Sequence, residues 1–238
     1  MSEKDHKVAI ITGGSQGIGA GLVAGYRRRG WAVVATSRAI KPTGDPAVLT
    51  IAGDVSEPAT ADRIIGEALG RFGRIDTLVN NAGVFIAKPF TDYTAEDYAS
   101  VVGVNLTGFF WLTLRAIAEM LKRGSGHVVN ITTTLVDYAN SSAPSVLTAL
   151  TKGGLAAATR SLAIEYASRG IRVNAVSPGI IQTPVHAPES YATLGPQLPP
   201  IGHLGQISDI VGGILFLESS PFITGEILHI DGGQIAGH

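Results

Sequence analysis

The chain has 238 residues, of which 45% are hydrophobic and 16% are charged, and this length suits one large α/β domain or two small ones. It contains no cysteine, which excludes disulfides, thiolate metal sites and a thiol nucleophile, and we expect no metal site. The formal net charge of −1 provides no basic surface for nucleic acid or an anionic membrane, so neither is expected as a partner.

Seven apolar runs that are typical of strands alternate with segments of helical spacing. Strands that are apolar on both faces and alternate with helices predict an α/β fold with a doubly wound parallel sheet of about seven strands. The connection 38–47 contains two prolines and a glycine, so we expect no full helix there. No linker or repeat interrupts the pattern, which predicts a single domain over residues 1–238. The strand-like runs cover residues 6–12, 31–36, 47–53, 75–80, 126–132, 171–177 and 226–230.

Neither the first residues of the chain nor its longest apolar run indicates a membrane protein. The first residues, MSEKDHKVAI, are too charged for a signal peptide. The longest apolar run, residues 101–114, is shorter than the roughly 18 residues that a membrane span requires. We therefore expect a cytoplasmic protein.

The first strand leads into a glycine-rich stretch, TGGSQGIG, at residues 12–19, which is followed by a helical pattern. Glycines at such a turn let a phosphate approach the backbone, and the helix N-terminus supplies free N–H groups and a partial positive charge. The spacing G-x-x-x-G-x-G places glycines at Gly13, Gly17 and Gly19. Packing alone can also explain such glycines, but the first strand of a doubly wound sheet is where these sheets bind nucleotides.

The end of the second strand indicates which nucleotide would bind. An acidic residue there would hydrogen-bond the ribose hydroxyls of NAD and repel a 2′-phosphate. This chain has Ser37 and Arg38 instead, a hydroxyl and a guanidinium that suit the phosphate, so NADP(H) is favoured over NAD(H). A solvated arginine at a strand end is the alternative interpretation. Asp54, after the third strand, could accept a hydrogen bond from the adenine amino group or serve only as a turn residue.

Three further motifs and a lysine then indicate a family. NNAG spans residues 80–83, VNLTG spans 104–108 and SPGIIQT spans 177–183, and Lys152 lies in a helical pattern of small and apolar residues. Together with the glycine turn they resemble the short-chain dehydrogenase/reductase family over nearly the whole chain. The resemblance implies a Rossmann-like domain that forms a homo-oligomer, a dimer or a homotetramer, through two long helices, here at about 103–123 and 145–169.

The resemblance also implies roles for individual residues. Asn105 would hold a water in a proton relay, and Lys152 would bind the nicotinamide ribose; independently of the family, a buried ammonium needs such acceptors. The remaining implied cofactor contacts follow the path of the nucleotide. They are Gly13, Ser15, Gly17, Ile18 and Gly19 at the pyrophosphate, Asp54 and Val55 at the adenine, Asn81, Ala82 and Gly83 at the adenosine ribose, and Pro178, Gly179, Ile181 and Thr183 at the nicotinamide.

The sequence departs from the family at the position that should carry the proton donor. In the family the residue four before the lysine is a tyrosine, and here it is Thr148. A free phenol titrates at about pH 10, whereas an aliphatic alcohol is a far weaker acid, so Thr148 does not inherit the role directly. The family's serine corresponds to Thr133, which keeps a hydroxyl to orient a substrate oxygen; Thr132 or Thr134 would take that role in a different loop register.

Two nearby side chains are candidate substitutes. Tyr138 lies in the loop after the fifth strand and could deliver a phenol, or could only pack on the substrate cleft. The ordinary pKa of a histidine would suit His186 to proton transfer, but a histidine in such a segment is more often a substrate contact or exposed. Asp137 is expected to be solvated. The proline-rich segment 183–205 resembles a substrate lid. Its apolar residues indicate a small-molecule substrate with a carbonyl or hydroxyl group and a nonpolar part; they are Val185, Tyr191, Leu194 and Leu198.

Three functions remain open from the sequence. The first is an NADP(H)-dependent oxidoreductase that interconverts a carbonyl and an alcohol with an atypical proton donor. The second is a cofactor-binding but catalytically weak or inactive member that acts as a sensor or regulatory partner. The third is a non-redox reaction at a carbonyl on the same scaffold. The fold alone does not separate them, because function depends on the site.

Overall fold

A computed structural model describes residues 6–183 and 199–237 of the chain. Its centre is one seven-stranded sheet in the order β3-β2-β1-β4-β5-β6-β7, and every neighbouring pair is parallel. This confirms the predicted doubly wound sheet, and no helix separates β2 from β3, as expected. The strands are β1 (Val8–Thr12), β2 (Ala32–Ser37), β3 (Val48–Ala52), β4 (Thr77–Asn80), β5 (Gly126–Ile131), β6 (Ile171–Pro178) and β7 (Ile227–Ile230).

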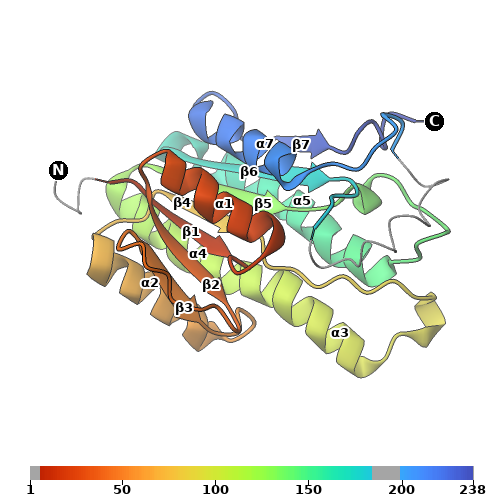
Figure 1. The fold of residues 1–238 in the computed structure, drawn as a ribbon, viewed down its shortest axis with the longest axis horizontal. Helices are drawn as coiled ribbons and strands as arrows, with labels where there is room; N and C mark the ends of the chain where they lie inside the picture. Colours follow the sequence, from red (N-terminus) through yellow and green to blue (C-terminus); the bar gives the residue numbers. More distant parts are fainter. Residues whose placement is uncertain (1–5, 184–198, 238) are drawn as a thin grey trace.

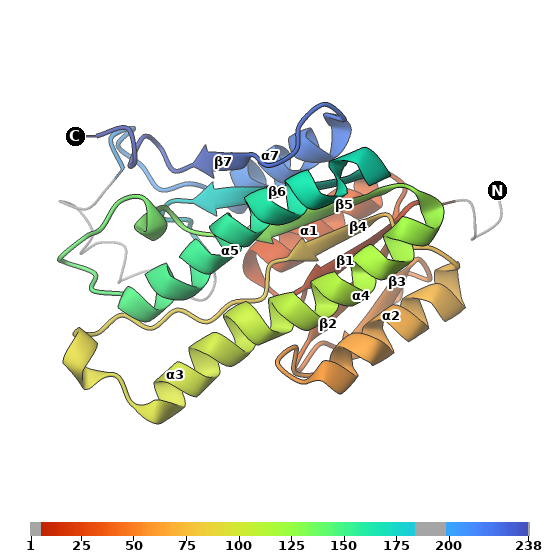
Figure 2. The same ribbon diagram turned by 180° about the vertical axis from the view of Figure 1, so that it is seen from behind.

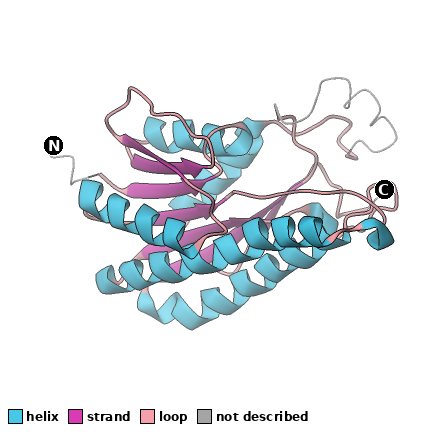
Figure 3. Ribbon diagram, turned by 90° about the horizontal axis from the view of Figure 1, so that it is seen from below, coloured by secondary structure: helices cyan, strands magenta, loops and turns pink. Residues whose placement is uncertain are grey.

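Helices cover both faces of the sheet (Figures 1–3). The helices α1 (Gly17–Arg28) and α7 (Ile207–Ser219) lie on the face seen in front in Figure 1. The helices α2 (Pro58–Phe72), α4 (Gly108–Arg123) and α5 (Val146–Tyr166) cover the opposite face, in front in Figure 2. Short helical turns also lie in the connections. They are η2 (Phe90–Asp92), η4 (Thr134–Val136) and η5 (Ala167–Arg169).

The alternation of side chains along β1 explains why the strands are apolar throughout. Val8 and Ile10 pack in the core under α2 and α4, whereas Ala9 and Ile11 pack in the core under α1 and α7. Each strand of the sheet interior must therefore supply apolar side chains to both layers. The two cores hold the carboxyl ends of all seven strands at one edge of the sheet.

The helical pattern expected to begin at residue 103 begins earlier. The structure has α3 (Ala95–Val102), then a π-helical turn η3 (Gly103–Thr107), and then α4, in one continuous run. Thr94 accepts a hydrogen bond from the Asp97 N–H, and the Asp97 side chain accepts one from the Thr94 N–H. This capping box fixes the start of the helix, so the expected boundary at residue 103 was wrong. The second long helix agrees with the expected range 145–169 once η5 is included.

The run Ala95–Arg123 is also the one stretch within residues 6–183 and 199–237 that is long and apolar enough, by length and composition alone, to cross a membrane. It is longer than the apolar run 101–114 considered from the sequence. In the fold its α4 part contributes Leu112, Ala116 and Met120 to the core beneath it. Burial of one side of the helix in this way is typical of a helix that packs as a layer on a sheet.

Candidate functional site

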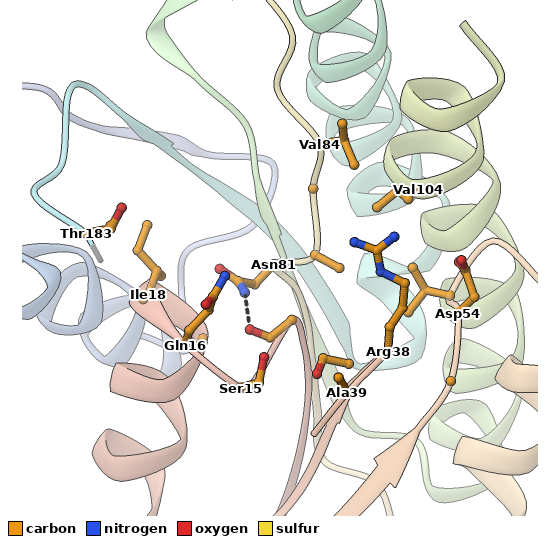
Figure 4. A pocket seen from close by; sticks show the side chains of 18 residues that line it. Ser15, Gln16, Ile18, Arg38, Ala39, Asp54, Asn81, Val84, Val104 and Thr183 are labelled. Carbon is orange, nitrogen blue, oxygen red and sulfur yellow. Dashed lines mark hydrogen bonds between the residues drawn. The ribbon is translucent and has the colours of Figure 1, made fainter. Parts of the chain in front are cut away.

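A cavity of about 510 Å³ lies at the carboxyl edge of the sheet, beside the turn between β1 and α1 (Figure 4). Most of the residues predicted to bind a nucleotide line it. These are Gly13, Ser15, Gly17, Ile18, Gly19, Ser37, Arg38, Asp54, Val55, Asn81, Ala82, Gly83 and Thr183. Five lining residues were not among those predicted. Gln16 and Val104 lie within the quoted motifs but were given no role, and Ala39, Gly53 and Val84 lie next to predicted residues.

The glycine turn adopts a backbone conformation that residues with a side chain would not allow. Gly13 and Gly17 have φ angles of +66° and +54°, in the left-handed region that favours glycine. A Cβ atom at Gly19 would lie 2.0 Å from the Gly13 carbonyl oxygen. The first turn of α1 therefore packs directly on the turn that precedes it, and its N–H groups stand next to the cavity.

The N-terminus of α1 is suited to an anion. Its N-cap residue, Gln16, makes no side-chain hydrogen bond to the first turn, and the first turn contains no acidic residue. Figure 4 shows Ser15, Gln16 and Ile18 on one side of the cavity. Uncapped N–H groups and the helix dipole at this point fit the pyrophosphate of a dinucleotide.

Asn81 holds the turn from the neighbouring strand. Its side-chain Nδ2 donates hydrogen bonds to the carbonyl oxygens of Thr12, at 2.8 Å, and Gly13, at 3.3 Å. Thr12 Oγ1 accepts hydrogen bonds from the N–H groups of Asn81 and Ala82, both at 2.9 Å, and donates one to the Val79 carbonyl. These bonds join the ends of β1 and β4 where the cavity begins.

We expect the Thr12→Val substitution to lower the free energy of unfolding by about 2 kcal/mol, because it leaves two N–H groups near the buried Thr12 side chain without their acceptor. Thermal and urea unfolding of the purified variant measure the loss. Thr12→Ser is the matched control, since it keeps the hydroxyl at the same place. A Thr12→Val variant as stable as the Thr12→Ser variant would contradict this role.

The opposite side of the cavity carries charge. Figure 4 shows Arg38 and Asp54 there, at the ends of β2 and β3. Asp54 Oδ1 accepts hydrogen bonds from the backbone N–H and the hydroxyl of Ser56, at 2.9 and 2.7 Å. These bonds, with a smaller contribution from Arg38, lower the pKa of Asp54. Arg38 is exposed to solvent at the cavity, where its guanidinium is available to an anionic ligand.

Lys152 lies on α5 behind the end of β5 and is 7% exposed. Its Nζ donates a hydrogen bond to the Ile131 carbonyl oxygen at 2.7 Å, and a Cβ atom at Gly83 would lie 3.2 Å from Nζ. Burial lowers the pKa of Lys152 to about 8. The ammonium therefore stands directly behind the NNAG turn, which lines the cavity.

Asn105 links three elements through its carboxamide. Its Oδ1 accepts a hydrogen bond from the Val84 N–H at 2.8 Å, and its Nδ2 donates to the Val84 carbonyl at 3.0 Å and to Thr151 Oγ1 at 3.1 Å. The side chain lies in η3, where the helix widens to a π-turn. Asn105 thus fixes the segment after β4 against α5, and its predicted role in holding a water remains a prediction.

Comparison with known proteins decides the family. A family model described as enoyl-(acyl carrier protein) reductase matches residues 13–234. The chain is 34% identical to a 3β-hydroxysteroid dehydrogenase of Eggerthella lenta, over 96% of this chain and 93% of that protein. It is 32% identical to the 3-oxoacyl-[acyl-carrier-protein] reductase FabG of Thermotoga maritima, over 96% and 98% of the two chains. The chain belongs to the short-chain dehydrogenase/reductase family.

Solved structures of this family agree with the fold. ElxO with NADP bound superposes with a TM-score of 0.88 at 29% identity, covering 98% of this chain and all of that one. A short-chain dehydrogenase of Bacillus anthracis gives a TM-score of 0.89 at 32% identity, covering 100% and 99%. The relatives are dehydrogenases and reductases, and the present chain is an oxidoreductase of the same family.

Among the four threonine hydroxyls considered as an orienting group or proton donor, that of Thr133 is the most accessible. It is half-buried after β5, and its Oγ1 accepts a hydrogen bond from the Leu135 N–H at 3.3 Å. Thr132 Oγ1 donates to the Val176 carbonyl at 3.1 Å, and Thr134 is buried. Thr148 is 4% exposed, and its Oγ1 has no hydrogen-bond partner among the residues that the structure describes.

Other predicted residues lie away from this cavity or beyond the described chain. Among the residues predicted to flank a nicotinamide, Thr183 lines the cavity, but Pro178, Gly179 and Ile181 do not. The Gly179 N–H donates to the Ile230 carbonyl, and Ile181 is buried in the core under α1 and α7. The predicted contact of Pro178, Gly179 and Ile181 with a nicotinamide therefore remains a prediction.

Of the two candidate substitutes for the proton donor, Tyr138 and His186, the structure describes only Tyr138. Tyr138 is half-buried after η4. Asp137 is exposed, as expected, and its Oδ2 also lies 3.1 Å from His229 Nε2. His186 falls outside the described residues, as do the apolar residues of the expected lid, Val185, Tyr191, Leu194 and Leu198.

Proposed function

We propose that the protein binds NADP(H) in the cavity beside the glycine turn and interconverts a carbonyl and an alcohol, with a proton donor other than the family's tyrosine. One observation is the main support for this proposal: the uncapped N-terminus of α1, the exposed Arg38 and the buried Lys152 all lie along one edge of the sheet. These groups match, in order, a pyrophosphate, a 2′-phosphate and a nicotinamide ribose.

The residues present fit the cofactor chemically. The left-handed glycines form a cradle that a Cβ would fill, and Lys152 has donors to spare for ribose hydroxyls. When bound, a nicotinamide supplies or accepts the hydride. The chain's own residues orient the ligand: Asn81 holds the glycine turn, Lys152 holds the ribose, and Thr133 orients the substrate oxygen.

Arg38→Ala is expected to weaken NADPH binding roughly 10- to 100-fold, because a charge-assisted bond to the 2′-phosphate is lost. NADH binding should stay within a few fold, since NADH lacks that phosphate. Fluorescence titration of both nucleotides into the wild type and the variant measures the effect. Equal losses for NADPH and NADH would contradict a 2′-phosphate contact, and no binding of either to the wild type would overturn the proposed function.

Thr148 supports a second candidate function. Because an aliphatic hydroxyl stands four residues before Lys152, the protein could bind the cofactor and act as a weak or inactive sensor or regulatory partner. ElxO with a tyrosine-to-phenylalanine substitution has been solved with NADPH bound, so in that protein the nucleotide still binds when a tyrosine loses its phenol. If the wild type binds NADPH without turnover and Thr148→Tyr gains turnover, the sensor function holds.

We also propose a homo-oligomer, a dimer or tetramer, built on α4 and α5. Apolar side chains on these helices stay exposed in the single chain, which is unusual unless a partner covers them. They are Phe110, Leu114, Leu150 and Ile164. Four further expectations from the sequence belong to the proposed function. The protein is cytoplasmic, it forms a single domain over residues 1–238, residues 183–205 act as a lid, and the substrate has a nonpolar part.

A further inference from the structure

A second cavity, of about 740 Å³, lies at the amino edge of the sheet. It is lined at the start of β5 by Gly126 and His127 and at the start of β6 by Ile171 and Arg172. This is the side of Figure 1 from which the chain enters β1, opposite the glycine turn, and the two cavities share no lining residue. Its volume lies in the range of about 300–1,000 Å³ that is typical of sites for small organic molecules. We call it the amino-edge cavity.

The carboxylates of the amino-edge cavity are already engaged within the fold. Among the residues that the structure describes, Asp76 and Glu218 line it. Asp76 Oδ2 accepts hydrogen bonds from Arg74 Nε at 2.7 Å and from the Val8 N–H at 2.8 Å. Glu218 Oε2 accepts three hydrogen bonds from buried side chains. Neither carboxylate therefore depends on a ligand for its partners.

Arg172 brings a half-buried positive charge to the same cavity. Its Nη1 donates to the carbonyl oxygens of Leu217, at 2.9 Å, and Ile223, at 3.2 Å, and its Nη2 donates to the Glu218 carbonyl at 3.2 Å. These partners are main-chain oxygens at the end of α7 and beyond it. Burial lowers the pKa of Arg172, and the nearby Glu218 carboxylate acts in the opposite direction. Glu218 thus offsets the charge of Arg172 without pairing with it.

Two further cations of the cavity, Lys7 and Arg123, are not compensated. Both are exposed, and within residues 6–183 and 199–237 neither forms an ion pair. Lys7 Nζ lies 5.2 Å from the centroid of the Trp31 ring, which leaves its three donors unused. Arg123 lies in the last turn of α4, where a cation also interacts with the helix dipole.

The sheet brings these two cations within reach of one ligand. Lys7 directly precedes β1, and Arg123 lies shortly before β5. Only β4 separates β1 from β5, and neighbouring strands are about 4.8 Å apart, so roughly 10 Å separates the two backbones. Two long side chains that line one cavity can span that distance around an anion.

The segment before β7 gives the amino-edge cavity an apolar wall. Pro221 and Phe222 line it, and the Phe222 side chain is fully exposed in the single chain. Covering an exposed aromatic ring with an apolar body removes its surface from water, which is favourable. The cavity therefore combines unpaired cations with a ring that a flat apolar group can cover.

We propose that the amino-edge cavity binds an organic phosphate, which is a dianionic phosphate group joined to a flat apolar body. Lys7 and Arg123 hold the phosphate, and Phe222 contacts the apolar body. A phosphate dianion matches the two uncompensated charges, and its terminal oxygens accept charge-assisted hydrogen bonds from cations on different elements. The site is separate from the proposed nucleotide site, because the two lie at opposite edges of the sheet.

Calorimetric titration of phenyl phosphate into the purified full-length protein, at constant ionic strength, tests the cations. We expect Lys7→Gln combined with Arg123→Gln to weaken binding at least about 10-fold, because two charge-assisted contacts are lost. Lys41→Gln combined with Lys122→Gln is the matched control, since it removes the same charge from exposed lysines that line neither cavity. Equal losses in the two double variants would overturn the inference, because binding would then follow net charge alone.

Phe222→Ala tests the apolar wall. We expect the wild type to bind phenyl phosphate about 10-fold more tightly than inorganic phosphate, and Phe222→Ala to remove that preference while keeping its affinity for inorganic phosphate. Phe222 is exposed, so the variant is expected to fold. A preference that survives in Phe222→Ala would overturn the assignment of the ring. Tighter binding of succinate than of phenyl phosphate would overturn the choice of a phosphate over a dicarboxylate.

The outcomes also separate this site from the proposed nucleotide site. Arg38→Ala and saturating NADPH should both leave the affinity for phenyl phosphate unchanged. If either abolishes binding, phenyl phosphate occupies the cavity beside the glycine turn and the inference is wrong. If the wild type does not bind phenyl phosphate at about 10 mM, the cations serve only the fold and the inference is wrong, while the proposed function stands. If NADPH does not bind, the proposed function fails, and the titrations of the double variants still decide this site.

Discussion

Gly19→Ala is expected to raise the dissociation constant for NADPH at least about 100-fold and to lower the melting temperature. The added Cβ would lie 2.0 Å from the Gly13 carbonyl oxygen and 2.7 Å from the Gly13 carbonyl carbon, so the turn and the first turn of α1 must separate. The atoms in the way are backbone, and overpacking of this kind costs about 1–3 kcal/mol even when the structure adjusts. The same adjustment moves the N–H groups that would hold the pyrophosphate. Fluorescence titration with NADPH measures the loss.

Gly66→Ala is the matched control for that substitution. Gly66 is exposed in α2, and a Cβ there would meet nothing within 4 Å. We expect it to stabilise the protein by roughly 0.5–1 kcal/mol, through helix propensity and a less flexible unfolded chain, and to leave NADPH binding unchanged. Equal affinity of the Gly19→Ala and Gly66→Ala variants for NADPH would contradict the assignment of the glycine turn.

Glu218→Ala is expected to lower the free energy of unfolding by roughly 3–5 kcal/mol. Glu218, near the end of α7, has one carboxylate oxygen, Oε2, that accepts hydrogen bonds from three elements. The donors are Thr77 Oγ1 at 2.8 Å, His127 Nδ1 at 3.0 Å and Tyr26 OH at 3.1 Å. Thr77, His127 and Tyr26 are all nearly inaccessible, so the substitution leaves buried donors without an acceptor.

Thermal unfolding tests this network, with a loss of roughly 10 °C expected for a chain of this size. Glu226→Ala is the control, since Glu226 is an exposed glutamate just before β7 and its removal should change the melting temperature little. A Glu218→Ala variant that melts with the wild type would show that the three donors find other acceptors.

The same network gives the protein a pH-dependent stability. Burial lowers the pKa of His127 below its ordinary 6.5. Burial acts to raise the pKa of Glu218, but hydrogen bonds from His127, Thr77 and Tyr26 outweigh it and hold that pKa below 4.5. Below pH 6.5 the unfolded chain therefore binds a proton that the folded chain does not, so stability falls as the pH drops through 6.5 and falls again below 4.5. The decline from pH 8 to pH 5.5 should be smaller in His127→Gln, which has no imidazole at this position but keeps a donor and an acceptor.

Periodicity and composition predicted the sheet because parallel strands buried on both faces need the same apolar residues at every position, as β1 shows. They did not predict the start of α3, although Thr94 and Asp97 form a recognisable capping box. Because of the apolar run at residues 101–114, we expected the helix to begin at about residue 103. In the structure, residue 103 begins only a π-turn within a longer helix. A local capping signal was thus outweighed by a hydrophobic pattern.

The candidate site was predictable where a motif fixes the backbone and unpredictable where distant side chains meet. The glycine turn and NNAG placed the cavity, but the sequence does not reveal that Ile131 supplies an acceptor for Lys152, because a carbonyl is present at every residue. The Glu218–His127 pair joins side chains 91 positions apart, and it was missed because no local sequence pattern links two residues so far apart. Gly179 and Ile181 belong to a motif of the family but do not line this cavity, so their contact with a nicotinamide stays a prediction.

The central claim is that NADP(H) lies along the carboxyl edge of this sheet. A crystal structure of the protein grown with saturating NADPH tests it most directly. The account predicts the pyrophosphate at the first turn of α1, the 2′-phosphate within hydrogen-bond distance of Arg38 and a ribose hydroxyl beside Lys152 Nζ. NADPH bound elsewhere, or a cavity that stays empty at saturation, would contradict it.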